Sequence, residues 1–97
     1  MPRQRRVVLP GCPHHLTQRG NNRRDVFFGD SDRMLYLSLL REYTSAYGVD
    51  ILGYCLMTNH VHLIAIPGDA AGLAKAIGRT HNDYARWLHI RRSESGR

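Results

Sequence analysis

The sequence has one lysine, two cysteines and no long apolar run. A membrane span needs about 20 apolar residues in a row, and a signal peptide needs an apolar stretch of about 7 to 15. Neither is expected, because the first apolar run, Val7-Val8-Leu9, is followed at once by Pro10-Gly11. Cys12 and Cys55 lack the spacing of a zinc ribbon or a disulfide framework. These absences predict a protein of a reducing compartment, the cytoplasm, with no membrane partner.

Acidic residues are also few: the sequence has 8 Asp and Glu residues and 14 Lys and Arg residues. Of these 14 basic residues, all except Lys75 are arginine. Guanidinium groups bind phosphate with paired donors and stack on bases, so this excess favours a nucleic-acid partner. A nonspecifically basic surface is the alternative that charge alone leaves open. The 97 residues are enough for one domain. Within it, residues 1–11 are predicted to form a basic arm and 93–97 an unstructured tail.

The order of the predicted elements is strand, helix, strand, strand, helix. Asp30 or Ser31 can cap the first helix, and Gly48 suits the position just after its end. In the last helix, Gly78 predicts a weak point where a bend is expected. The pattern corresponds to an α+β, ferredoxin-like or RRM-like split βαβ fold with an antiparallel sheet, two main helices and the last strand missing. The predicted strands span residues 14–19, 49–57 and 60–66. The first predicted helix runs from its cap at Asp30 or Ser31 to Tyr47, and the last one runs from Asp69 or Ala70 to about Arg91.

Two histidines, His60 and His62, lie one residue apart in the second strand of the predicted hairpin. Side chains alternate along a strand, so both rings point to the same face. A metal ion or a phosphate would use such a two-nitrogen site, whereas two hydrogen-bonded histidines at a half-buried edge are the structural alternative. In the first strand, His14 and His15 point to opposite faces, so one of them can approach this pair.

Tyr84 lies on the apolar stripe of the last predicted helix, where a tyrosine usually belongs to the core. His81 precedes it by three residues, so the same helix face also carries an imidazole. A helix packed across the sheet would be able to bring this phenol to the histidine pair.

Together these residues resemble the HUH single-tyrosine transposases, and among them those associated with bacterial repetitive extragenic palindromes. The most specific part is the run from Tyr54 to Leu63, in which Thr58 replaces the proline that is common in the family. The resemblance implies that His60 and His62 bind Mg²⁺ or Mn²⁺ at the scissile phosphate of single-stranded DNA. It implies further that Tyr84 is the nucleophile. The other matching segments are residues 14–23, Val26-Phe27, Asp32-Arg33 and residues 84–88.

The chemistry implied by this family is DNA cleavage and rejoining at hairpin or palindromic sequences through a 5′-phosphotyrosine. The covalent intermediate conserves bond energy for rejoining, so no ATP is needed. Because imidazole is not a preferred ligand of Mg²⁺, a third side chain, water and phosphate oxygens must complete the site. Some relatives supply a Gln four residues after the tyrosine, where this chain has Leu88. His81 has the best helical spacing among the candidates for a third ligand.

The loop after the first strand is predicted to contact DNA phosphates. A glycine-asparagine turn can present backbone N–H groups to an anion, and the arginines beside it neutralise charge. A solvated loop is the alternative for these side chains. The predicted DNA-binding residues are Arg19, Asn21, Asn22, Arg23 and Arg24.

A noncatalytic nucleic-acid-binding module derived from a transposase is the alternative function. It is suggested by the expectation that the C-terminal part of the family domain, with the last strand, is missing from this chain. The unpaired sheet edge would then invite dimerisation or strand exchange, and both a monomer and a homodimer are open. A histidine-triad nucleotide hydrolase would need a third alternating histidine, and position 64 is Ile. A zinc-binding regulator is disfavoured because no cysteine or third histidine lies at the sequence spacing of zinc ligands. The expected location of a transposase-like protein is the nucleoid.

Overall fold

The computed structural model describes residues 7–19 and 24–95. The side chains of residues 92–95 are not part of this description. Asn21, Asn22 and Arg23, which we predicted to bind DNA, lie outside the described residues, as do residues 1–6 of the basic arm.

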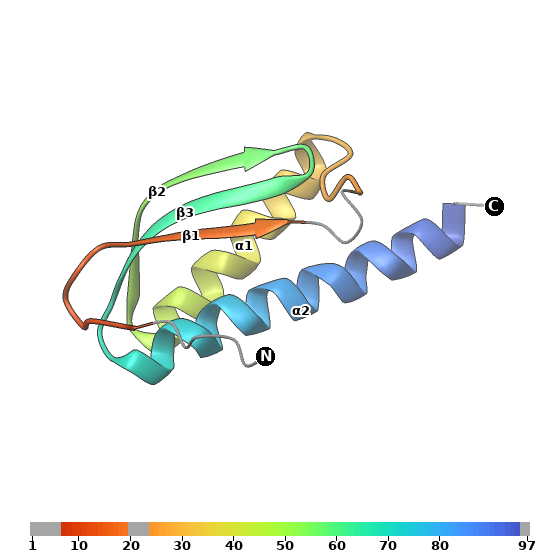
Figure 1. Ribbon diagram of the computed structural model, residues 1–97. Coiled ribbons are helices and arrows are strands. Elements are labelled where there is room, and N and C mark those ends of the chain that lie inside the picture. Colours follow the sequence, from red (N-terminus) through yellow and green to blue (C-terminus); the bar gives the residue numbers. More distant parts are fainter. Residues whose placement is uncertain (1–6, 20–23, 96–97) are drawn as a thin grey trace, which may run out of the picture.

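The described residues form a three-stranded antiparallel sheet and two helices, whose arrangement is drawn in Figure 1. The strand order is β1-β3-β2, so β1 lies at one edge of the sheet. This α+β arrangement confirms the predicted fold class, and β1 is the edge at which a fourth strand of the split βαβ plan would pair. The elements, in chain order, are β1 (His14–Arg19), α1 (Asp30–Tyr47), β2 (Val49–Met57), β3 (His60–Pro67) and α2 (Ala70–Ser95).

Different hydrogen bonds cap the two ends of α1. At its N-terminus the cap is Gly29, which makes no side-chain hydrogen bond, so the prediction that Asp30 or Ser31 caps the helix was wrong. Instead, the Asp32 carboxylate reaches back and accepts a hydrogen bond of 2.7 Å from the backbone N–H of Phe28. The C-terminal end is as predicted: Gly48 adopts the left-handed conformation, with φ of 71°, and its N–H donates to the carbonyl of Thr44.

Helix α2 is longer and more regular than the sequence predicted. Its first turn is capped by Asp69, whose Oδ1 accepts a hydrogen bond of 2.6 Å from the N–H of Gly72. The helix passes through Gly78 without a break and continues to Ser95, so residues 93–95 are helical rather than part of an unstructured tail. None of the helices in the described part of the chain is long and apolar enough to span a bilayer.

The sheet has one buried face and one open face. Along β3, Val61, Leu63, Ala65 and Pro67 are buried against the helices. The residues between them alternate to the other side. Figure 1 shows both helices on one side of the sheet, so the open face is not covered by either of them. The arrangement leaves the histidine positions of β3 accessible.

Candidate metal and DNA site

The open face of the sheet carries the predicted histidine pair. His60 and His62 are both half-buried, and their ring centroids are 4.8 Å apart with ring planes at 75°. Val61 between them is only 3% exposed and points to the helices. The strand alternation therefore places the two imidazoles side by side, as the sequence predicted.

One ring nitrogen of each histidine is already held by the protein. The Nδ1 of His60 lies 2.7 Å from the Oδ1 of Asn59. The Nδ1 of His62 lies 3.1 Å from the Nε2 of His15 and 3.3 Å from the Oγ1 of Thr17. Within the described part of the chain, no hydrogen bond uses the Nε2 of His60 or His62. Protein-bound metal ions are commonly held by histidines whose other ring nitrogen is fixed in this way.

His15 is a member of the site. The sequence predicted only that either His14 or His15 could approach the histidine pair. Its ring stacks on that of His62, with centroids 5.2 Å apart and planes 3° from parallel. The neighbouring His14 instead holds the chain before β1, since its Nδ1 bonds to the carbonyl of Cys12 and its Nε2 accepts from the N–H of Leu9. Because the pairing of β1 with β3 is long-range, only the fold decides which of the two rings joins the pair.

The strands on either side of β3 complete the surface around the histidines. In the antiparallel register, Thr17 and Cys55 lie opposite His62, while Arg19 and Met57 lie opposite His60. Directly paired residues share a face of the sheet, so the exposed Arg19 side chain is on the same face as the pair. A cationic group therefore lies one strand away from the two imidazoles.

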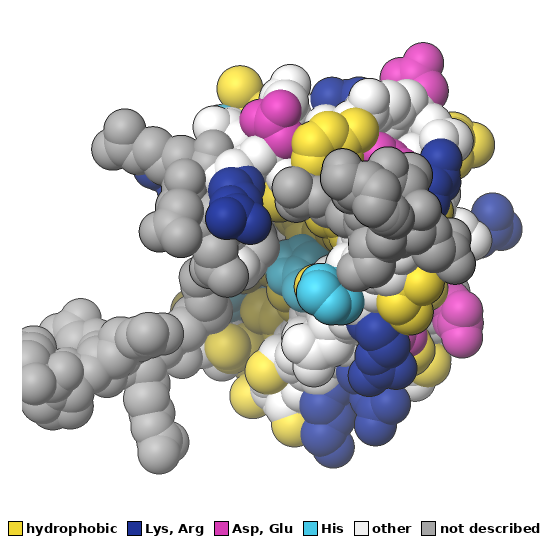
Figure 2. Space-filling view, turned by 90° about the vertical axis from the view of Figure 1, so that its right-hand side faces the viewer, with side chains coloured by type: hydrophobic (Ala, Val, Ile, Leu, Met, Phe, Trp, Pro, Cys, Tyr) yellow, Lys and Arg dark blue, Asp and Glu magenta, His cyan; other side chains and the backbone are white. Residues whose placement is uncertain are grey.

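Charged side chains surround histidines at the end of the molecule near the β2–β3 turn. Figure 2 views this end and shows histidine side chains near its centre, with Lys and Arg side chains on several sides and Asp and Glu side chains among them. Arg24 is exposed. The arginines near the histidines are the groups at this end that would attract a polyanion.

Tyr84 does not lie with the histidine pair in this structure. It is on α2, only 5% exposed, and its ring packs against those of Phe27 and Tyr36. Its hydroxyl donates a hydrogen bond to the carbonyl of Val26. Since the helices and the histidine pair are on opposite faces of the sheet, the structure does not bring the phenol to the imidazoles.

The environment of Tyr84 also opposes its ionisation. Burial raises the pKa of the phenol above its ordinary value, and the nearby negative charge of Asp32 raises it further, against a smaller lowering by Arg33. A phenolate nucleophile would need the reverse. As described, Tyr84 is a core residue.

His81 is likewise on the helical side of the sheet. Its Nε2 lies 2.6 Å from the hydroxyl of Tyr36, and the two rings stack with centroids 5.6 Å apart. Burial lowers the pKa of His81 to about 4, so the ring is neutral at pH 7. The structure does not bring His81 to the pair, and its ring nitrogen is engaged with a tyrosine.

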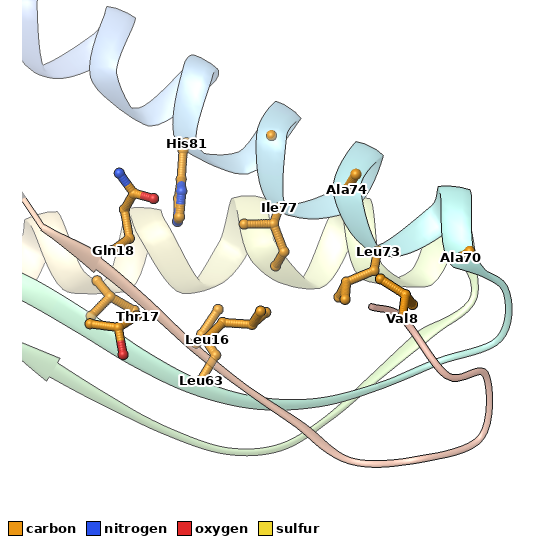
Figure 3. Close-up of a pocket in the computed structure, with 12 residues that line it drawn as sticks. Val8, Leu16, Thr17, Gln18, Leu63, Ala70, Leu73, Ala74, Ile77 and His81 are labelled. Atoms are coloured by element: carbon orange, nitrogen blue, oxygen red, sulfur yellow. The ribbon is translucent and has the colours of Figure 1, made fainter. Parts of the chain in front are cut away.

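A cavity of about 520 Å³ lies under the edge of the sheet, between β1 and α2. Its walls are mainly apolar, with Leu16 from the sheet and Leu73 and Ile77 from the helix, and Gln18 and His81 lie at one end (Figure 3). Its lining also includes Thr17, whose Oγ1 lies 3.3 Å from the Nδ1 of His62, whereas His60 and His62 themselves do not line it.

Among the described residues, the histidine pair is not joined by a third metal-ligating side chain. In residues 7–19 and 24–95, no group of three or more His, Cys, Asp or Glu side chains is placed to hold a metal ion. A divalent ion at the pair would therefore have two imidazole ligands, and water and phosphate oxygens would have to fill the rest of its coordination shell.

The fold and the site define a class of protein: a small α+β domain with a histidine pair on the open face of an antiparallel sheet. The family model described as "Transposase IS200 like" matches residues 9–97, and the chain belongs to that family. No significant match was found among curated proteins or among solved structures. A transposase-type function, with DNA as the partner, follows from the family.

Proposed function

We propose that the open face of the sheet binds single-stranded DNA with hairpin or palindromic structure, with a Mg²⁺ or Mn²⁺ ion held by His60 and His62. The observation that carries the proposal is the state of the two rings. Each has its Nδ1 engaged by a neighbouring side chain while its Nε2 is unused among the described contacts. Neither imidazole serves the core, because both alternate with the buried positions of β3.

The protein groups divide the work at such a site. A divalent ion, when bound, would polarise the scissile phosphate. His60 and His62 would fix its position, and Arg19, opposite His60 in the register, would neutralise an adjacent phosphate. Arg24, together with Asn21, Asn22 and Arg23 before it in the sequence, is proposed to extend the contact with the DNA backbone.

Strand cleavage would use Tyr84 as the nucleophile. The phenol oxygen would form a bond to the phosphorus as the bond to the 3′ oxygen breaks, and the phenol proton would pass through water to the 3′ oxygen. The products would be a 5′-phosphotyrosine and a free 3′-hydroxyl, and reversal would rejoin a strand. This step requires Tyr84 to leave its hydrogen bond with Val26 and reach the other face of the sheet.

A noncatalytic nucleic-acid-binding module is the second candidate. The burial of Tyr84 and the raised pKa of its phenol favour this noncatalytic function. The two histidines are accessible on the open face of the sheet, whereas the phenol is on the helical side. In that case the protein would bind the hairpin as a monomer or homodimer, without forming a covalent bond. Either function places the protein with DNA in the cytoplasm, at the nucleoid.

One experiment separates the two candidates. The protein is incubated with labelled single-stranded hairpin DNA and Mn²⁺, and covalent adducts are resolved on denaturing gels. An adduct that is lost in Tyr84→Phe and kept in Tyr36→Phe, a second buried tyrosine, supports cleavage by Tyr84. Binding in a mobility-shift assay with no adduct in any variant supports the noncatalytic module. Absence of both binding and adduct contradicts the proposed function.

A further inference from the structure

The contact between His15 and His62 joins two ring nitrogens. The Nε2 of His15 and the Nδ1 of His62 are 3.1 Å apart, within hydrogen-bond distance. A neutral imidazole has one N–H donor and one acceptor nitrogen, so in this contact one ring must donate and the other accept. The direction of the bond decides which nitrogen of His62 carries the proton.

The two directions have opposite consequences for metal binding. If His15 donates, His62 is protonated on Nε2, and the nitrogen on the free side of the ring has no lone pair to offer. If His62 donates from Nδ1, its Nε2 has a lone pair for a metal ion. The Oγ1 of Thr17, 3.3 Å from the same Nδ1, can also accept this proton.

We infer that His15 acts as the acceptor and is a positioning residue, which holds His62 in the tautomer with a free Nε2. The inference rests on the proposed metal site and deepens it. His60 supports it: the Oδ1 of Asn59 can only accept, so His60 is protonated on Nδ1 and presents Nε2. With His62 in the same tautomer, both rings offer the same nitrogen on the same face.

The fold is built to keep His15 in this position. β1 pairs with β3 so that His15 is opposite Ile64 and diagonal to His62, and Leu16 next to it is buried in the core. The rings of His15 and His62 are nearly parallel, at 3°. Partners of this kind fix ring orientation as well as tautomer, and their loss typically costs about 10- to 100-fold in metal affinity.

The test begins with the metal-free protein. Nitrogen NMR of histidine-labelled protein at pH 8 reports which nitrogen of His62 is protonated. We expect Nδ1–H in the native chain and in His15→Gln, whose amide oxygen can accept, and a shift toward Nε2–H in His15→Leu. His14→Leu, on the other face of β1, is the matched control and should leave His62 unchanged. Amide spectra confirm that each variant is folded.

Mn²⁺ affinity provides the second readout. Titration followed by electron paramagnetic resonance should give an affinity about 10- to 100-fold weaker in His15→Leu and within about threefold of native in His15→Gln. The inference is overturned if native His62 carries its proton on Nε2, or if His15→Leu changes neither the tautomer nor the affinity. A native protein that does not bind Mn²⁺ at all contradicts the proposed metal site, whereas the tautomer measurement still decides the role of His15.

Discussion

The hydroxyl of Tyr84 donates a hydrogen bond to the backbone carbonyl of Val26 and thereby ties α2 to the segment beneath the β2–β3 turn. The N–H groups of Val26 and Phe27 in turn donate to the carbonyl of Thr58, at 2.8 and 3.2 Å. The turn that precedes the histidine pair is thus connected to α2 through one short chain of hydrogen bonds. Tyr84 supports the site from the opposite side of the sheet.

Removing this hydroxyl should destabilise the fold by a modest amount. Tyr84→Phe keeps the ring packing with Phe27 and Tyr36 but leaves the Val26 carbonyl without its donor, so we expect a loss of about 1 kcal/mol in the free energy of unfolding. Urea unfolding followed by circular dichroism measures it. Tyr54→Phe, at a tyrosine that is 57% exposed, should change the stability little. Equal effects of the two substitutions would contradict the structural role of Tyr84.

His81 should make the protein sensitive to acid. Its pKa is lowered from 6.5 to about 4 by burial, so below pH 6.5 the unfolded chain binds a proton that the folded chain does not. Stability is therefore lost as the pH falls from about 6.5 to about 4, by as much as about 3 kcal/mol from this residue. His81→Gln should reduce the loss of unfolding free energy between pH 7 and pH 4.

The control for this prediction is His89→Gln, because His89 is exposed on the same helix. Its substitution should leave the pH dependence of unfolding as in the native chain. If His81→Gln and the native protein lose the same free energy over this pH range, His81 is not a buried neutral histidine in solution.

Arg19 should contribute to DNA affinity through charge. Arg19→Ala should weaken binding of a single-stranded hairpin and reduce the slope of log affinity against log salt by roughly 0.7, the value for one phosphate contact on a single strand. Fluorescence anisotropy across a salt series measures the slope. Arg41→Ala, an exposed arginine on α1, removes the same charge from the helical side and should keep the native slope. An unchanged slope in Arg19→Ala would place the DNA elsewhere.

Local signals in the sequence were sufficient for the type and order of the elements, but not for the N-terminal cap of α1 or the C-terminal end of α2. Gly48 ended α1 as expected, and the apolar alternation of Val61, Leu63 and Ala65 marked the buried face of β3. The same alternation already placed His60 and His62 on the opposite face. These features depend on neighbours along the chain, and they were predictable for that reason.

Long-range packing decided the rest of the site. The position of Tyr84 on the apolar stripe of α2 predicted a core residue, and Tyr84 is buried. The further prediction that α2 would bring Tyr84 to the histidines depended on how the helix packs on the sheet, which no local sequence pattern specifies. His15 joins His62 only through the register of β1 on β3. His81 shares a helix face with Tyr84, and its ring contacts Tyr36 on the helical side of the sheet.

Mn²⁺ binding by the histidine pair is the measurement that tests the account most directly. Electron paramagnetic resonance titrations compare the native chain, His60→Ala/His62→Ala and the control His89→Ala, each with and without single-stranded hairpin DNA. We predict that the native chain and the control bind Mn²⁺ and that the affinity rises with DNA, whose phosphate adds oxygen ligands, whereas the double variant binds DNA but no Mn²⁺ at the site. Equal Mn²⁺ affinity in the native chain and the double variant would contradict the account.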